Sequence, residues 1–124
     1  MDRAERAVEL KHSGNNCCQA VLLAFADELG GDEAELRAMG AAFGCGMGTF
    51  EATCGALCGA QMILGLKRFS GRSVLADAKV LYGTFRAMCG STECGELKGI
   101  KTGKMLCSCD DCVRCAAKLA GKLI

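Results

Sequence analysis

Apolar residues recur along this chain at steps of three and four, the spacing that gathers them on one face of a helix. No run alternates apolar and polar residues as a half-buried strand does. The spacing predicts helices over about residues 2–12, 16–29, 32 onward, 51–66, 73–89 and 110–123, with a short turn of helix over 93–98. We therefore expect an all-α fold, a single-domain bundle of about five to six helices around a central helix rich in Gly, Ala and Cys.

Helix-starting residues support these boundaries. Asn15 or Asn16 is placed to cap the second helix, because a short polar side chain can accept from the free N–H groups of a first turn. Asp32 with Glu35 has the spacing of a capping box, and a short turn of helix after Thr92 is expected to have its capping-box Glu at residue 96. FGCGMG, residues 43–48, predicts a glycine-rich connection into the central helix.

Composition removes several classes of function. The length of 124 residues suits a single domain spanning 1–124. The formal net charge is +1, and the chain has five Phe, one Tyr and no Trp, so it lacks the basic surface and the stacking aromatic residues that bind nucleic acid, and the positive charge that binds an anionic membrane. The longest apolar run, ATCGALCGAQMILGL, is shorter than the roughly 20 residues a membrane helix needs. We expect no nucleic-acid partner and no membrane insertion.

Cysteine changes the picture, because eleven of the 124 residues are Cys. The odd number and the charged start, MDRAERAVELKH, argue against a secreted disulfide scaffold. We therefore predict a cytoplasmic protein, in which such a pattern points to metal or redox chemistry. Packing as a small hydrophobic residue is the alternative for any single cysteine.

Three cysteines, Cys17, Cys18 and Cys54, fall near predicted helix starts. The unpaired N–H groups there favour a thiolate, which is both a nucleophile and a metal ligand. Cys54 and Cys58 stand four apart on one face, a geometry for two thiolates on one metal or for a thiol facing a partner from another helix. Their neighbours Gly55 and Gly59 predict close approach of a packed helix, or of a cofactor.

The segment CSCDDCVRC, residues 107–115, places three cysteines at C-x-x-C-x-x-C. In a helix these thiols span about a third of the circumference and can share a site with Cys89, Cys94 or Cys107. Cluster or metal ligation, redox-active thiols and packing all remain open. His12 is the single histidine and lies on the polar side of its helix, so a metal would be held by sulfur, as iron–sulfur, zinc or cuprous copper.

Several stretches together resemble the family of proposed redox-active proteins named C-GCAxxG-C-C. They are NCCQAVLLAF (16–25), FGCGMG (43–48), CGALCGA (54–60), MILGLK (62–67), ECGELKG (93–99) and CDDCVRCAAKLAGKL (109–123). The family is small and helical, with four characteristic cysteines. The resemblance implies that these correspond to Cys17, Cys54, Cys94 and Cys109, with Cys112 as a rival for the last.

The leading hypothesis is a cytoplasmic redox-active thiol protein with an unknown redox partner. Cys54, with Cys17, would be the thiolate that is oxidised or attacks a disulfide, and Cys94 and Cys109 would resolve it. The alternative is a metal or iron–sulfur protein, not necessarily an enzyme, using the same four cysteines, with Cys58, Cys107, Cys112 and Cys115 as further ligand candidates. The third is a structural or interaction domain, including a homodimer through the nearly uncharged residues 38–66.

Overall fold

The computed structural model describes residues 2–124, and this part of the chain contains helices and no strand. The helical segments are α1 (Arg3–His12), α2 (Cys17–Ala24), α3 (Ala26–Leu29), α4 (Glu33–Gly40), η1 (Gly46–Phe50), α5 (Gly55–Arg68), α6 (Leu75–Cys89), α7 (Cys94–Lys98) and α8 (Cys109–Leu123). The prediction of an all-α single domain is confirmed. The expected number of five to six helices was wrong, since the described residues form nine helical segments.

Two local breaks account for much of the difference in number. The helix expected over 16–29 is divided at Phe25, whose backbone leaves the helical region, into α2 and α3. The expected glycine connection, residues 43–48, does lead toward the central helix, and its second half belongs to the turn η1, in which Met47 and Gly48 have non-helical backbone angles. The central helix also begins later than residue 51: Cys54 caps it and Gly55 is its first residue.

The helix caps follow the sequence only in part. Asn16 forms a full capping box, in which its side chain accepts from the Gln19 N–H and its own N–H donates to the Gln19 side chain. Asp32 caps α4, and its side chain accepts a hydrogen bond from the Ala34 N–H. The expected capping box would have used the Glu35 N–H instead.

The start of α7 differs more. Ser91, not Thr92, donates its hydroxyl to the Glu96 carboxylate at 2.6 Å, and the same hydroxyl accepts from the Glu93 N–H. The Thr92 hydroxyl bonds instead to the Tyr82 hydroxyl at 2.8 Å. The predicted Thr92–Glu96 box was therefore wrong, because tertiary contact with α6 takes the threonine side chain.

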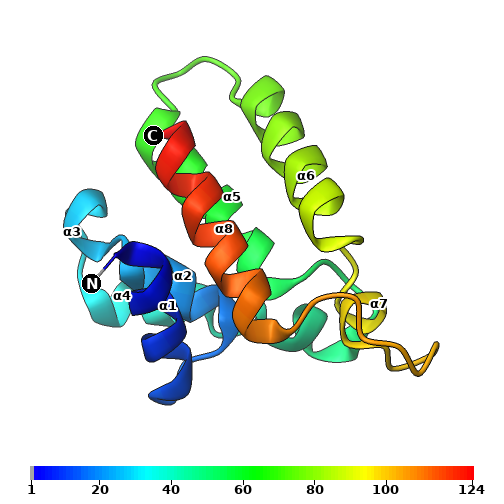
Figure 1. Ribbon diagram of the computed structural model, residues 1–124. Helices are drawn as coiled ribbons and strands as arrows, with labels where there is room; N and C mark the ends of the chain where they lie inside the picture. Colours follow the sequence, from blue (N-terminus) through cyan, green and yellow to red (C-terminus); the bar gives the residue numbers. More distant parts are fainter. Residues whose placement is uncertain (1) are drawn as a thin grey trace.

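The three longest helices, α5, α6 and α8, form the main body, with α1, α2, α3 and α4 along one side (Figure 1). Helix α5 packs against α2 and α8, and α8 also lies against α1 and α6. The predicted central helix is confirmed, since Gly55, Ala56, Leu57, Gly59, Ala60, Ile63 and Leu64 are all buried.

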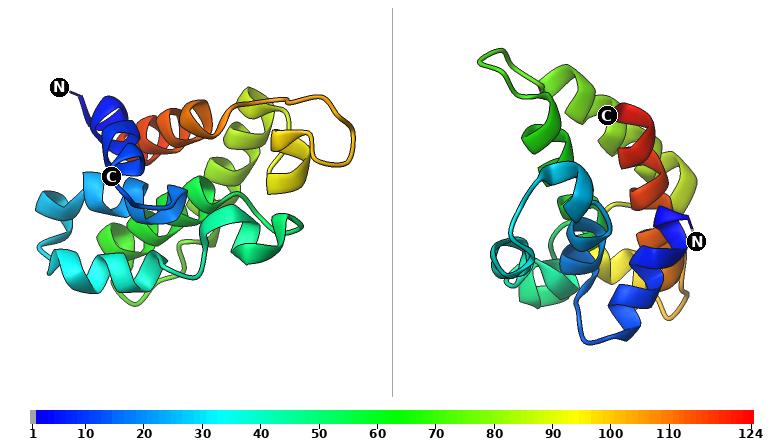
Figure 2. Two further views of the ribbon diagram at one scale, coloured as in Figure 1. Left: turned by 90° about the horizontal axis from the view of Figure 1, so that it is seen from below. Right: turned by 90° about the vertical axis from the view of Figure 1, so that its left-hand side faces the viewer.

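Helix α7 and the loop after it lie at the opposite end of the molecule from α3, as Figure 1 and the left-hand view of Figure 2 both show. That loop folds back, since the N–H groups of Leu106 and Cys107 both donate to the Leu97 carbonyl. Within residues 2–124, no helix combines the length and apolarity required to cross a bilayer.

Candidate thiol site

Four helices begin at one place in the molecule, and each begins with a cysteine. Cys17, Cys94 and Cys109 are the first residues of α2, α7 and α8, and Cys54 is the cap of α5. These are the four cysteines to which the resemblance pointed. The first N–H groups of a helix carry partial positive charge, which favours a thiolate, while burial acts in the opposite direction and raises the pKa of Cys94.

Two glycines bring the start of α2 against α5. A Cβ atom on Gly55 would lie 2.7 Å from the Phe43 carbonyl oxygen and 3.4 Å from the Cys18 nitrogen. A Cβ atom on Gly59 would lie 2.9 Å from the Cys18 carbonyl oxygen. Because only glycine permits this approach, CGALCG sets the distance between Cys17 on α2 and Cys54 on α5. The close neighbour is a packed helix, as expected.

A short backbone pairing brings α5 and α7 together. The Cys54 N–H donates to the Thr92 carbonyl at 2.7 Å, and the Cys94 N–H donates to the Ala52 carbonyl at 3.0 Å. Thr53 and Glu93 form an isolated antiparallel bridge between them. This pairing holds Cys54 and Cys94 on adjacent segments, although 40 residues separate them in the chain.

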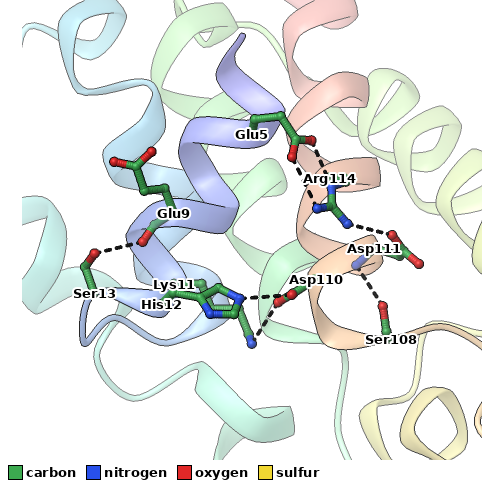
Figure 3. A network of polar contacts seen from close by, with 9 residues as sticks. All are labelled: Glu5, Glu9, Lys11, His12, Ser13, Ser108, Asp110, Asp111 and Arg114. Atoms are coloured by element: carbon green, nitrogen blue, oxygen red, sulfur yellow. Dashed lines mark hydrogen bonds and ion pairs between the residues drawn. The ribbon is translucent and has the colours of Figure 1, made fainter. Parts of the chain in front are cut away.

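Polar contacts attach the start of α8 to the end of α1 (Figure 3). Asp110 accepts from the Lys11 ammonium at 3.1 Å and lies 2.9 Å from the His12 Nε2 atom. The Ser108 hydroxyl caps α8 by accepting from the Asp111 N–H. These contacts place Cys109 beside the turn from α1 into α2, and therefore beside Cys17.

Seven thiols line one small cavity at this meeting point. Its walls are Cys17, Cys45, Cys54, Gly55, Cys94, Leu97, Lys98, Cys107, Cys109 and Cys112. The cavity encloses about 10 Å³, close to the space of one water molecule. No extended substrate fits inside, so chemistry with a large reagent must take place at thiols that reach the surface.

The seven thiols differ in their exposure. Cys45 is exposed, and Cys17, Cys107 and Cys109 are half-buried. Cys54, Cys94 and Cys112 are buried, and all seven are free thiols. A reagent arriving from solvent therefore meets Cys45, Cys17, Cys107 and Cys109 before the deeper three.

Cys109 has the most favourable surroundings for a thiolate. A hydrogen bond from the Cys17 thiol, followed by the positive charges of Lys98 and Lys11, lowers the pKa of Cys109 to about 5. The same interaction with Cys109, together with burial, raises the pKa of Cys17. The surroundings of the pair therefore favour a thiolate on Cys109 and a protonated thiol on Cys17.

A second unequal pair lies deeper, between α5 and α8. The neighbouring Cys112 thiol and the backbone N–H groups of Ala56 and Leu57 lower the pKa of Cys54 to about 7, against the opposing effect of burial. The contact with Cys54 and burial raise the pKa of Cys112. Cys54 therefore has the helix-start stabilisation expected from the sequence, but it is only 6% exposed.

The loop that carries Cys45 has an unusual backbone. Cys45, Met47 and Phe50 have φ angles of 53°, 57° and 63°, in the left-handed region that costs an L-residue roughly 1–2 kcal/mol. The loop presses on the start of α7, since a Cβ atom on Gly46 would lie 2.7 Å from the Cys94 Cβ atom. Such strain is found at functional sites. Cys45 of this loop lies in the cavity wall.

A separate group of three sulfurs adjoins the cavity. The Sγ atoms of Cys89, Cys107 and Cys112 all lie within 4.8 Å of one another. Within residues 2–124, these three cysteines are the side chains among Cys, His, Asp and Glu that form a group of three or more with all ligand atoms this close together. The sequence had already suggested Cys107 and Cys112 as metal ligands. Cys89, at the end of α6, had been considered only as a partner for the C-x-x-C-x-x-C cysteines.

The remaining candidates lie elsewhere. Cys58 faces a different groove, lined by Phe43, Met47, Thr53, Leu57, Gln61, Met62 and Tyr82, and is not part of the cavity wall. Cys115 packs beside Met88, with 4.0 Å between their sulfur atoms, and contacts Cys89. His12 is exposed and paired with Asp110. The structure therefore separates Cys58 from the site, although Cys58 and Cys54 are one turn apart.

The comparison with protein families agrees with the sequence motifs. Residues 15–123 match the family described as "Putative redox-active protein (C_GCAxxG_C_C)". The chain belongs to this family. The match confirms the resemblance to the C-GCAxxG-C-C proteins, and it covers all eleven cysteines. No curated protein and no solved structure matches the chain.

Proposed function

We propose that this member of the C-GCAxxG-C-C family is a dithiol redox protein in which Cys17 and Cys109 form the exchanging pair. The observation that carries the proposal is the position of this pair. Both thiols are half-buried at the edge of the cavity, each at the start of a helix. Lys98 and Lys11 lie near enough to stabilise a negative sulfur on Cys109.

The reaction is a two-electron exchange with a partner disulfide. The Cys109 thiolate attacks one sulfur of the partner, the partner's S–S bond breaks, and its other sulfur leaves as a thiolate. Cys17 gives its proton to a departing partner sulfur and attacks the Cys109 sulfur of the mixed disulfide. The products are a Cys17–Cys109 disulfide and a reduced partner with one thiol and one thiolate, and the thiolate takes its proton from solvent.

Burial decides the roles in this proposal. Cys54 had been the leading nucleophile from its helix-start position, but a partner disulfide cannot enter a cavity of about 10 Å³ to meet it. We assign the entering attack to Cys109 for that reason. Cys54, with Cys94 on the adjacent segment, then lies behind the outer pair as a deeper thiol that no partner disulfide reaches directly.

The test maps the first disulfide. Reduced protein is treated with oxidised glutathione under anaerobic conditions, quenched with an alkylating reagent and analysed by peptide mass spectrometry. We expect a Cys17–Cys109 disulfide first. In Cys17→Ser, a mixed disulfide of glutathione with Cys109 should accumulate, because the resolving thiol is absent.

Cys58→Ser is the matched control, since it removes a half-buried thiol outside the cavity. This variant should form the Cys17–Cys109 disulfide at the wild-type rate. A first disulfide without Cys109, or a Cys17→Ser protein with no glutathione on Cys109, would overturn the assignment.

Metal binding is the second candidate, and the three-sulfur group of Cys89, Cys107 and Cys112 favours it. That set differs from the four cysteines Cys17, Cys54, Cys94 and Cys109 that the sequence offered as ligands. An iron–sulfur or zinc site on those four has no comparable support, because their sulfurs do not form a group with mutual separations as short.

A further inference from the structure

The three sulfurs of Cys89, Cys107 and Cys112 converge from three separately anchored segments. Cys89 is the last residue of α6, and Cys112 lies in the first turn of α8. Cys107 precedes α8 in the loop, and its N–H donates to the Leu97 carbonyl at 3.2 Å. We infer that these three thiols form a binding site for a thiophilic cation of the zinc and cuprous copper class.

Distance supports this reading. Three thiolates around one zinc ion, each at about 2.3 Å from it, lie about 3.8–4.0 Å apart. The observed sulfurs lie within 4.8 Å of one another, so their separations must shorten by at most about 1 Å, which changes of side-chain rotamer can supply. Packing of α6 against α8 already holds Cys89 and Cys112 in place.

The types of ligand select the metal. The group contains three sulfurs and no oxygen or nitrogen ligand from His, Asp or Glu. Thiolates prefer Zn²⁺, Cu⁺ and similar soft or borderline ions to Mg²⁺, Ca²⁺ or Mn²⁺. Cys89 and Cys112 are buried, which keeps competing water away from the bound ion.

A metal ion can reach the three sulfurs from solvent. Cys107 is half-buried and lies in the loop that covers α7, so an ion can enter from that side. Binding replaces the S–H protons of the three thiols by S–metal bonds and releases the protons to solvent. No electron is transferred, so the site is independent of the proposed exchange at Cys17 and Cys109.

A titration of reduced, metal-free protein with Zn²⁺ against a chromophoric chelator tests the site under anaerobic conditions. We expect one equivalent of tightly bound Zn²⁺ and at least about a tenfold loss of affinity in Cys107→Ser. Cys107 is the half-buried member in a loop, so this substitution disturbs the core least. Cys58→Ser should bind as the wild type does. Equal affinity of wild type and Cys107→Ser would overturn the inference.

Location is tested by alkylating the protein with and without Zn²⁺. The metal should protect Cys89, Cys107 and Cys112, while exposed Cys45 stays reactive. Protection centred on Cys17 and Cys109 would overturn the assignment.

Two variants separate this result from the redox proposal. Cys109→Ser should bind Zn²⁺ normally but form no Cys17 disulfide, and Cys107→Ser should show the reverse. Loss of both properties in both variants would refute the independence of the two sites.

Discussion

The contact between Gly59 of α5 and the start of α2 gives the sharpest test of how the site is assembled. In Gly59→Ala, the new Cβ atom would lie 2.9 Å from the Cys18 carbonyl oxygen and 3.1 Å from the Val21 Cβ atom. Ordinary contacts of a Cβ atom begin near 3.4 Å. Helices α2 and α5 must therefore separate by about half an ångström, and Cys17 and Cys54 with them.

The expected cost follows from two opposing effects. Overpacking of this kind costs about 1–3 kcal/mol, whereas replacing a helical Gly by Ala stabilises by about 1 kcal/mol. Gly59→Ala should therefore lower the free energy of unfolding by about 0–2 kcal/mol. Gly83→Ala in α6 is the matched control, because a Cβ atom there meets nothing within 4 Å and should stabilise by about 0.5–1 kcal/mol.

Urea and thermal unfolding of the reduced proteins, followed by circular dichroism, measures the difference. The two variants should differ by about 0.5–3 kcal/mol, or by roughly 4 °C in Tm for each kcal/mol. Cys54 should also alkylate faster in Gly59→Ala, because separation of α2 from α5 exposes it. A Gly59→Ala protein as stable as Gly83→Ala would refute the close-packing explanation of CGALCG.

Two further predictions concern electrostatics and capping. Lys98→Met removes a positive charge beside Cys109, so the midpoint of the alkylation rate of Cys109 against pH should rise from about 5 toward the ordinary value of 9.0, and the rate at neutral pH should fall. Lys101→Met is the control, because this side chain is exposed, and it should leave the pH profile of Cys109 unchanged. A similar shift in both variants would contradict the role of Lys98. Asn16→Ala removes the capping box of α2 and should lower the free energy of unfolding by about 1 kcal/mol in urea titrations, so an unchanged midpoint would contradict that role.

Helix boundaries show how far local patterns reach. The capping box of Asn16 could be predicted because its bonds join residues three apart. Thr92 and Glu96 are four residues apart, one more than a capping box needs, and the threonine hydroxyl bonds to Tyr82 of α6. Phe25 gave no local sign of a helix break, since its burial in the core depends on helices distant in sequence.

The cysteines of the candidate site also divide into those that the sequence indicated and those that only the packing of the helices revealed. Cys17 and Cys54 stood out because helix starts stabilise thiolates wherever they lie. Cys45 and Cys89 received little weight because neither has such a local signal. Their importance appears only when the strained loop and the end of α6 are brought to the same region of the molecule.

The sequence by itself therefore determined the all-α class, the buried central helix, the family and the helix starts that carry Cys17, Cys54, Cys94 and Cys109. Hydrophobic periodicity, helix caps and short motifs depend on residues that are close in sequence, so they can be recognised from the sequence alone. The tertiary structure alone decided which sulfurs meet. It joined Cys109 to Cys17, grouped Cys89 with Cys107 and Cys112, and turned Cys58 toward another groove, because those distances depend on how the helices pack.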